Sequence, residues 1–337
     1  MRYYKTEYED INRFRGEYYF LSNFYPVVIV FDGITYLSSE SAYQAQKCQN
    51  VSDRQQFSKL SADESKRLGS KVHLRPDWNE VKLPLMKEIV RAKFTQHRYL
   101  AEWILGTGDK ELKEGNTWRD TFWGIDLKTG EGENHLGKIL MGLRKNFKEN
   151  GLPDESDSPR MRFDSALHIS VVFGDITQSD CMCIVNAANK SLLEANGSES
   201  MLHFAAGSEL MKELKALDNC PVADVKITRG YNLKAQYIIH TVAPHYPQKD
   251  CEVLLRRAYR NTLELAKEYG ITSIAFPAIS TGACSYPKKE ATKIAVETVY
   301  EWIYNNPDSP IKVEFTCADN VIYKYFCEKI KCFGQPL

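Results

Sequence analysis

One short stretch in the N-terminal half combines residue types suited to acid–base and nucleophilic chemistry. Residues 38–47 are SSESAYQAQK, in which Ser38 or Ser39 suits the N-cap position of a helix. One face of that helix would carry a carboxylate, a phenol, an amide and an amine, from Glu40, Tyr43, Gln44 and Lys47. On an ordinary surface helix such a stripe is solvated and forms at most a weak ion pair. The alternative is that the stripe lines a site.

An aromatic-rich hairpin is predicted immediately upstream. Residues 20–36 are FLSNFYPVVIVFDGITY, two strand-like runs separated at Asp32-Gly33, which is a strong signal for a two-residue turn. A hairpin that leads into a helix with a polar face favours a pocket wall over a free surface.

The composition restricts the class of protein. The length of 337 residues suits two domains, and 44 basic residues balance 44 acidic ones, so no global field favours nucleic acid or an anionic membrane. A local patch could still bind nucleic acid. No apolar run approaches the ~18 residues of a membrane span, and the N-terminus lacks the apolar core of a signal peptide. Nine scattered cysteines without a CxxC pair indicate reduced thiols, no metal site and no cofactor, so we expect a cytoplasmic protein.

Residues 1–150 are predicted to form a mostly helical α+β domain. Helices are expected over 61–70, between a capping signal and a glycine stop, over 81–107, which has a 3.6-residue period, and from 133 to about 147. A second polar segment, GNTWRDTFWG, occupies residues 115–124.

Several segments of this half carry a family resemblance. They are FLSNFYP at 20–26, FDGITYLSSESAYQAQK at 31–47, RPDW at 75–78, DTFWGI at 120–125 and GENHLGKILM at 132–141. In this order they resemble the NADAR (YbiA-like) family across nearly all of residues 1–150. That family cleaves N-glycosidic bonds, either in phosphoribosylamino intermediates of riboflavin synthesis or between ADP-ribose and guanine. The resemblance implies that this domain is an N-glycosidase.

The residues suit that chemistry. Cleavage of a ribose C1–N bond requires stabilisation of an oxocarbenium-like centre and a proton for the departing nitrogen. Lys47, if desolvated, could attack C1 as a neutral amine and form a ring-opened Schiff base. We therefore predict that Lys47 is the nucleophile and Glu40 the proton carrier, while Asp120 holds ribose hydroxyls or assists as acid or base.

Further residues of this domain are predicted to bind substrate. Trp78 and Trp123 offer flat surfaces that stack on the leaving base or on adenine. The other predicted substrate-binding residues are Asn23, Tyr43, Gln44, Gly124, Asn134 and Gly137. Two basic groups are candidate contacts to nucleic acid, one formed by Lys71, His73 and Arg75, the other by Arg91, Lys93, His97 and Arg98.

The second half has a different pattern. Residues 151–165, rich in Pro, Gly, Ser and Asp, are predicted to be a linker, and residues 166–337 a three-layer α/β domain with right-handed crossovers. Strands are expected at 168–173, 183–185, 223–228, 237–241, 273–276 and 312–316, and helices at 251–269, 288–304 and 321–330.

Three segments of this half resemble a macrodomain. They are GDIT at 174–177, IVNAAN at 184–189 and PAISTG at 277–282, and the resemblance implies ADP-ribose recognition. Asp175 follows a strand and could accept a hydrogen bond from the adenine amine, while the loop at 280–282 offers backbone N–H groups to a diphosphate. The predicted ligand-binding residues are Asp175, Ile176, Asn186, Asn189, Ser280, Thr281, Gly282 and Tyr286.

The macrodomain segments also depart from the family pattern. Macrodomains that hydrolyse usually carry a run of glycines and then Val-Asp-Gly where this chain has EANG at 194–197 and Ser-Glu-Ser at 198–200. Cys284-Ser285 replaces an aromatic–Gly pair, and Ala318 stands where an adenine-stacking aromatic is common. We therefore expect this domain to bind or position ADP-ribose and the N-terminal domain to perform the hydrolysis.

Together the two resemblances predict an ADP-ribosyl glycohydrolase. Its N-terminal domain would remove ADP-ribose from guanine in nucleosides, nucleotides or DNA. One alternative is an N-glycosidase of riboflavin-pathway intermediates. A second, from another class, is a non-catalytic reader of ADP-ribose.

Overall fold

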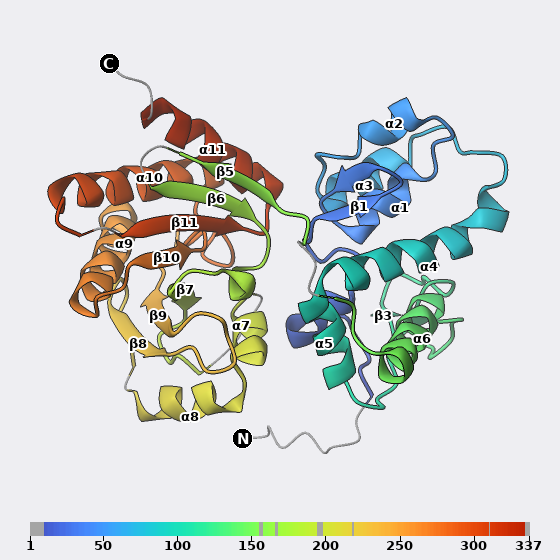
Figure 1. The fold of residues 1–337 in the computed structure, drawn as a ribbon, viewed down its shortest axis with the longest axis horizontal. Helices are drawn as coiled ribbons and strands as arrows, with labels where there is room; N and C mark the ends of the chain where they lie inside the picture. Colours follow the sequence, from blue (N-terminus) through green and yellow to red (C-terminus); the bar gives the residue numbers. More distant parts are fainter. Residues whose placement is uncertain are drawn as a thin grey trace. The chain divides into compact units, whose positions relative to one another are not determined.

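The computed structural model describes residues 10–154, 158–165, 168–193, 198–217, 219–309 and 311–333. The chain divides into two compact units, Met1–Pro159 and Arg160–Leu337 (Figure 1). All nine cysteines are free thiols. Among the described residues, no helix has both the length and the apolarity required to cross a membrane.

The first unit is mostly helical. Its helices are η1 (Gly16–Leu21), α1 (Ser39–Ala45), α2 (Val51–Gln55), α3 (Ala62–Gly69), α4 (Trp78–Gln96), α5 (Arg98–Gly106) and α6 (His135–Asn150). Two small sheets complete it: β1 (Ile29–Phe31) pairs antiparallel with β2 (Ile34–Tyr36), and β3 (Gly115–Asn116) pairs parallel with β4 (Ile125–Asp126).

The predicted hairpin is confirmed and leads into α1. Phe31 pairs with Ile34, so the turn contains only Asp32 and Gly33. These two residues have φ of 51° and 72°, as the favoured tight hairpin turn requires. Ser38 then caps α1, because its hydroxyl accepts a hydrogen bond from the Ser41 backbone N–H at 3.0 Å. Every residue of α1 is buried, so its polar face is not a solvated surface.

Helix α3 packs against α1 and begins with the predicted capping signal. Ser61 and Glu64 form a capping box, in which each side chain accepts a hydrogen bond from the backbone N–H of the other residue. The helix ends at Gly69, the predicted stop.

The single helix predicted over 81–107 is wrong, because two helices occupy this region. Helix α4 begins at Trp78 and ends at Gln96, and α5 begins at Arg98. Between them His97 is extended, with φ of −133° and ψ of 91°, and its Nε2 forms a 2.6 Å hydrogen bond with the Val28 carbonyl oxygen. The apolar period continues through the break, so periodicity alone does not reveal it.

The second unit contains a seven-stranded sheet. Its strands are β5 (Met161–Asp164), β6 (Ile169–Phe173), β7 (Cys183–Ala188), β8 (Val225–Arg229), β9 (Tyr237–Val242), β10 (Ser273–Phe276) and β11 (Lys312–Cys317). Its helices are η2 (Ile176–Gln178), α7 (Ser198–Ala206), α8 (Ser208–Ala216), α9 (Cys251–Glu268), α10 (Lys288–Asn305) and α11 (Asn320–Phe333). The strand order is β5-β6-β11-β10-β7-β9-β8, and only the edge strands β5 and β8 run antiparallel to their neighbours.

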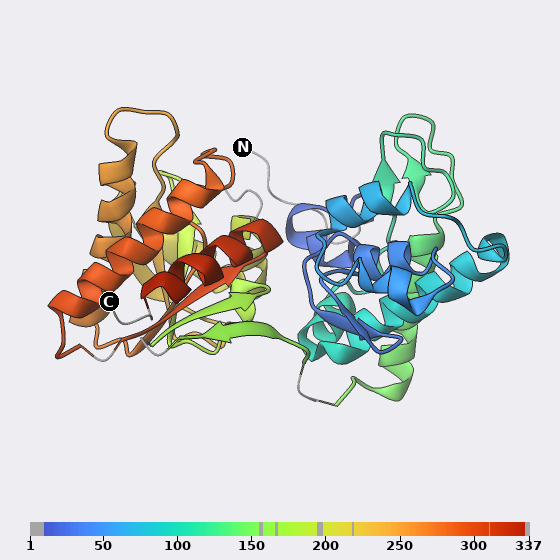
Figure 2. The same ribbon diagram turned by 90° about the horizontal axis from the view of Figure 1, so that it is seen from above.

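Helices cover both faces of this sheet, which confirms the predicted three-layer α/β architecture. Alternate strand residues enter two hydrophobic cores: Val185 packs into the core that contains α9, α10 and α11, and Ile184 into the one that contains α7 and α8. Figure 2 shows α10 and α11, orange to red, lying side by side on one face.

Strand β5 lies inside the segment predicted to be a linker. It pairs antiparallel with β6 from Met161↔Phe173 to Asp164↔Ser170. Composition favoured a linker over 151–165, but residues 161–164 are MRFD, which alternates apolar and charged side chains as a half-buried edge strand does. The prediction is therefore wrong for these four residues.

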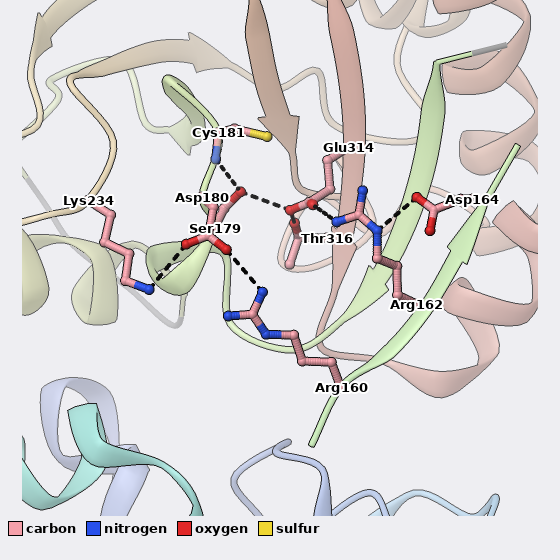
Figure 3. Close-up of polar contacts among 9 residues, drawn as sticks. All are labelled: Arg160, Arg162, Asp164, Ser179, Asp180, Cys181, Lys234, Glu314 and Thr316. Atoms are coloured by element: carbon pink, nitrogen blue, oxygen red, sulfur yellow. Dashed lines mark hydrogen bonds and ion pairs between the residues drawn. The ribbon is translucent and has the colours of Figure 1, made fainter. Parts of the chain in front are cut away.

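A buried carboxylate ties β5 to the centre of the sheet. Arg162 on β5 reaches past β6 and donates from a terminal guanidinium nitrogen to Glu314 Oε2 on β11 at 3.1 Å (Figure 3). Glu314 is 7% exposed, and its other oxygen accepts from the hydroxyls of Ser179 at 2.8 Å and Thr316 at 3.0 Å. The edge strand is thus held by a charge as well as by its ladder.

Arg162→Ala is expected to lower the free energy of unfolding of the second unit by about 2 kcal/mol. The substitution leaves a buried carboxylate oxygen without its cationic partner. Arg160→Ala is the matched control, because its ion pair with Asp180 is exposed on both sides and contributes less than about 1 kcal/mol. Urea unfolding followed by circular dichroism measures both, and equal losses would contradict the account of Glu314.

Candidate functional site

Helix α1 presents a buried carboxyl–amide pair. Glu40 and Gln44 are 7% and 6% exposed, and Gln44 Nε2 donates to Glu40 Oε1 at 2.8 Å. Burial raises the pKa of Glu40, and the charge of Asp120 adds to that rise. The Gln44 hydrogen bond and the two nearby lysines, Lys66 and Lys47, act in the opposite direction. A carboxyl with a raised pKa holds its proton to higher pH than an ordinary glutamate does, as a proton carrier requires.

Lys47 lies in the turn that follows α1. The helix ends at Ala45, two residues before Lys47, whose backbone N–H donates to the Gln44 carbonyl at 3.3 Å. Its Nζ donates to the Gly69 carbonyl at 3.1 Å and lies 6.0 Å from the centroid of the Trp78 ring. Burial lowers the pKa of Lys47, which increases the fraction of neutral, nucleophilic amine.

Three aromatic rings, those of Tyr43 on α1, Trp78 and Trp123, lie close together. The Tyr43 ring centroid lies 5.1 Å from that of Trp78 and 5.5 Å from that of Trp123. Burial raises the pKa of Tyr43, so its hydroxyl stays protonated. The structure therefore brings together three residues that the sequence predicted separately. Their stacking on a base stays a prediction.

Asp120 is fixed by the loop that carries it. Its Oδ1 accepts from the backbone N–H groups of Phe122 at 3.2 Å and Trp123 at 2.9 Å. Asn116 holds the loop from the other side, through a 3.0 Å bond from the Asp120 N–H to its Oδ1. The charge of Asp120 raises the pKa of both Glu40 and Tyr43, which shows that the three groups interact.

Asn23 adjoins the start of α1. Its carbonyl oxygen accepts from the Glu40 N–H at 2.9 Å, and its Nδ2 contacts Met86 Sδ at 3.2 Å. Within the described part of the chain, its buried Oδ1 has no hydrogen-bond partner. Substrate binding by Asn23 stays a prediction that this open acceptor suits.

The remaining predicted residues of this unit, Asn134, Gly124 and Gly137, contact the backbone of residues 112–114. Asn134 Nδ2 donates to the Leu112 carbonyl at 2.9 Å, and its Oδ1 accepts from the Glu114 N–H at 3.1 Å. A Cβ atom at Gly124 would lie 2.0 Å from the Glu114 carbonyl oxygen, and one at Gly137 would lie 2.0 Å from that of Leu112. These contacts position residues 112–114, and direct substrate contacts by the three residues stay predictions.

Sequence reasoning missed two residues on α3. Lys66 Nζ lies 5.3 Å from the Phe24 ring centroid and 5.9 Å from that of Trp118, and its charge acts on both Glu40 and Lys47. Gly69 supplies the carbonyl that Lys47 binds, and a Cβ there would lie 2.0 Å from Gln44 Oε1. The helix itself was predictable, but no local signal indicates that it packs on α1.

The prediction that the second basic group contacts nucleic acid is wrong for two of its members. Lys93 and His97 are 1% and 4% exposed and face the interior. Lys93 Nζ donates to the carbonyls of Phe20 at 2.5 Å and Ser22 at 2.8 Å, and burial lowers its pKa to about 7. The helical period placed Lys93 among apolar residues, and that pattern was the signal of burial.

In the second unit, Asp175, Ile176 and Asn189 lie just after strands, as predicted, whereas Asn186 lies within β7. Asp175 caps η2, where its Oδ1 accepts from the Thr177 N–H at 2.9 Å, and Ile176 begins that helix. Asn189 follows β7, and its Oδ1 accepts from the Ser191 hydroxyl at 2.7 Å. The altered segment 194–197 lies outside the described residues.

Asn186 belongs to a buried polar chain. Its Nδ2 lies 3.1 Å from His240 Nδ1, and His240 Nε2 lies 2.9 Å from the Thr228 hydroxyl. Burial lowers the pKa of His240 to about 3, so the ring is neutral. The Asn186 side chain is thus buried and hydrogen-bonded within the protein.

The side-chain hydroxyls of the loop at 277–282 are hydrogen-bonded within the protein. The Ser280 hydroxyl donates to the Pro244 carbonyl at 3.0 Å, and the Thr281 hydroxyl donates to that of Ala278 at 2.8 Å. A Cβ at Gly282 would meet nothing within 4 Å. Tyr286 is buried, and its N–H donates to the Ser280 carbonyl at 2.9 Å. Among the described residues, no group of three or more His, Cys, Asp or Glu side chains could hold a metal ion.

Comparison with known families agrees with the division of the chain. The NADAR domain model matches residues 8–148, and the Macro domain model matches residues 185–295. A Macro domain-containing protein of Methanosarcina mazei is 44% identical over 165 residues, which are 48% of this chain and 86% of the relative. The chain therefore belongs to the Macro domain family and carries a NADAR domain ahead of its Macro domain.

Two further relatives extend the comparison. ADP-ribose glycohydrolase MACROD1 of Rattus norvegicus is 36% identical over 231 residues, 65% of this chain and 86% of the relative. The solved structure of the Oceanobacillus iheyensis macrodomain with ADP is 37% identical and covers 52% of this chain and 96% of that one, with a TM-score of 0.49.

Gly69→Ala is expected to destabilise the first unit by about 1–3 kcal/mol. The added methyl group would overlap the Gln44 side chain and displace it from Glu40. Gly106→Ala is the matched control, because Gly106 also ends a helix and a Cβ there meets nothing within 4 Å. Denaturant unfolding of both variants tests the contact, and an undiminished stability of Gly69→Ala would show that Gln44 is not held in this position.

Proposed function

We propose that the first unit is an N-glycosidase that releases ADP-ribose from ADP-ribosylated guanine through Lys47. The observation that carries the proposal is the contact set of Lys47. Its partly buried amine has a lowered pKa and lies beside an aromatic group, and its charge acts on the buried carboxyl of Glu40. An amine with a lowered pKa and a carboxyl with a raised pKa can act as nucleophile and as proton donor, respectively.

The proposed reaction uses each group once. Lys47 Nζ bonds to ribose C1 as the C1–N bond to guanine breaks, and the departing nitrogen takes the proton carried by Glu40. The ring oxygen then leaves C1 and takes up a proton, while Nζ loses one, which gives an open-chain Schiff base. Water adds to C1 and Nζ departs, so free ADP-ribose is released and Lys47 is regenerated. Asp120 holds ribose hydroxyls near C1.

We further propose that the second unit binds or positions ADP-ribose. Support comes from its family and from a relative named as an ADP-ribose glycohydrolase. The backbone of the loop at 280–282 suits a diphosphate, because the hydroxyls of Ser280 and Thr281 are already bonded within the protein.

Lys47→Ala is expected to lower kcat/KM for ADP-ribosylated guanosine by at least about a thousandfold, because the nucleophile is lost. Release of free ADP-ribose by the full chain, followed by chromatography, measures it. Lys87→Ala, which removes an exposed lysine of α4, is the matched control. Reduction with borohydride during turnover should attach substrate to wild-type protein and leave Lys47→Ala unmodified.

Other outcomes of the same experiment point elsewhere. Undiminished release by Lys47→Ala would place the chemistry in the second unit. Faster turnover of a phosphoribosylamino-pyrimidine by wild type would favour the riboflavin-pathway function. Tight binding of ADP-ribose without turnover of either substrate would favour a reader.

An exposed tryptophan supports a polynucleotide substrate. Trp118 is 55% exposed, and the Lys66 ammonium lies 5.9 Å from its ring centroid. An exposed aromatic ring with a cation beside it is the arrangement on which bases of a single strand stack. We propose that Trp118 binds a nucleotide next to the modified guanine.

Trp118→Ala is expected to lower kcat/KM about tenfold for an ADP-ribosylated DNA oligonucleotide and much less for the free nucleoside. Stacking on an aromatic side chain contributes about 1–3 kcal/mol per base. Tyr304→Ala is the control, because Tyr304 is 76% exposed on the second unit. Parallel assays of the two substrates test the prediction, and equal losses on both would rule out a flanking contact.

A further inference from the structure

Lys47 lies in a segment that no helix holds. Helix α1 ends at Ala45 and α2 begins at Val51, so residues 46–50 belong to neither helix. Outside a helix, backbone carbonyls take their hydrogen bonds from other parts of the chain. The three consecutive carbonyls of residues 47–49 each accept such a bond, and the donors belong to only two arginines.

One side chain, that of Arg54 on α2, binds two of these carbonyls. Its Nε donates to the Cys48 carbonyl oxygen at 3.0 Å, and its Nη2 donates to that of Gln49 at 3.3 Å. The backbone N–H of Arg75 donates to the Lys47 carbonyl oxygen at 2.9 Å. The segment that follows the Lys47 Cα atom is therefore held by donors from outside α1.

The guanidinium of Arg54 is itself fixed by the β1–β2 hairpin. Its Nη1 donates to Asp32 Oδ2 at 2.6 Å, and the Arg54 side chain is only 11% exposed. Asp32 is one of the two turn residues, so its position is set by the hairpin. All three nitrogens of the guanidinium thus bind the protein, which fixes the orientation of this planar group. The hairpin turn thereby determines where the carbonyls after Lys47 lie.

The position of the Lys47 backbone affects the position of its amine. Nζ donates to the Gly69 carbonyl at 3.1 Å and lies 6.0 Å from the Trp78 ring centroid. The lysine stem is flexible, so these contacts select one of many side-chain conformations only while the backbone stays in place. A displacement of about 1 Å at a reacting group can lower the rate about a hundredfold.

We propose that Arg54 is a positioning residue of the N-glycosidase site, which connects the hairpin turn at Asp32 to the backbone that carries Lys47. This inference rests on the proposed role of Lys47 as nucleophile. Arg54 acts through the segment after Lys47 and does not touch the reacting atoms. The planar fork is essential to this role, because a lysine ammonium is a point charge that cannot reproduce the same three contacts.

Arg54→Lys in the full chain is expected to lower kcat for ADP-ribosylated guanosine about tenfold to a hundredfold and to change KM much less. A misplaced nucleophile impairs the chemical step more than it impairs binding. Arg13→Lys is the matched control, since Arg13 is an exposed arginine of the same unit, and its kcat should equal that of wild type. An unchanged kcat in Arg54→Lys would overturn the proposal.

The hairpin turn offers a second variant. Asp32→Asn keeps a residue that tolerates the positive φ of the turn but removes the charge that binds Arg54. Its loss of kcat should be smaller than that of Arg54→Lys, and the double variant should lose no more than Arg54→Lys alone. Independent, additive losses would show that Asp32 does not act through Arg54.

A role in folding alone gives a different result. It predicts that Arg54→Lys unfolds at lower urea concentration while kcat of the folded protein stays at the wild-type value. That combination would also overturn the proposal.

A readout without turnover separates this inference from the proposed function. Carbon-13 NMR of lysines labelled at Cε follows the titration of Lys47, whose signal is assigned by its absence after Lys47→Ala. Burial lowers the pKa of Lys47, and the titratable groups that act on it are Glu40, Lys66 and Cys48. Arg54→Lys changes none of these groups and keeps its own positive charge, so a moved midpoint reports a change of position.

The Lys47 midpoint should rise toward that of an exposed lysine in Arg54→Lys, because the amine leaves its partly buried place, and should stay unchanged in Arg13→Lys. An unmoved midpoint in Arg54→Lys, or an equal rise in both variants, refutes the positioning role. A rise confined to Arg54→Lys in a protein without glycosidase activity supports the positioning of Lys47 and refutes only the proposed function.

Discussion

Removal of α1 from water is the constraint on which the first unit depends. The helix has only seven residues, and each of them is buried. On a protein surface the carboxyl of Glu40 and the amine of Lys47 would have ordinary pKa values. Here the pKa of Glu40 is raised and the pKa of Lys47 is lowered. Burial is the first cause in both cases, and the hydrogen bonds of Gln44 and Gly69 make that burial tolerable.

The surrounding elements are arranged to permit close approach to this helix. Gly69 lets α3 approach the Gln44 side chain, Gly124 lets its loop lie against the Glu114 carbonyl, and Gly137 lets α6 lie against the Leu112 carbonyl. Lys93 holds the segment before Asn23 in place by donating hydrogen bonds to two of its backbone carbonyls. The glycines and the buried lysine thus serve the geometry of the site more than its direct chemistry.

The second unit uses buried polar groups in a different way. Glu314, Ser179, Thr316 and Arg162 form a satisfied network that joins an edge strand to the sheet, as Figure 3 shows. Asn186, His240 and Thr228 form a second chain inside the sheet. The loops that follow β6, β7 and β10 remain at the carboxyl ends of parallel strands, where ligands of such sheets bind.

The sequence by itself determined the elements with strong local signals and the two families. The Asp32-Gly33 turn, the Ser38 cap, and the six strands and three helices predicted in the second unit were predictable, because turn chemistry and apolar periodicity are local properties. Helices α7 and α8 were not among the predicted helices. It missed the break at His97 and the strand β5, since a hydrogen bond from another element decides the first and pairing with β6 supports the second. Only the tertiary structure decided that α3 brings Gly69 and Lys66 to Lys47 and Glu40, and that Lys93 is buried against two backbone carbonyls. Burial and charge–charge coupling depend on which distant segments pack together, and no local pattern records that.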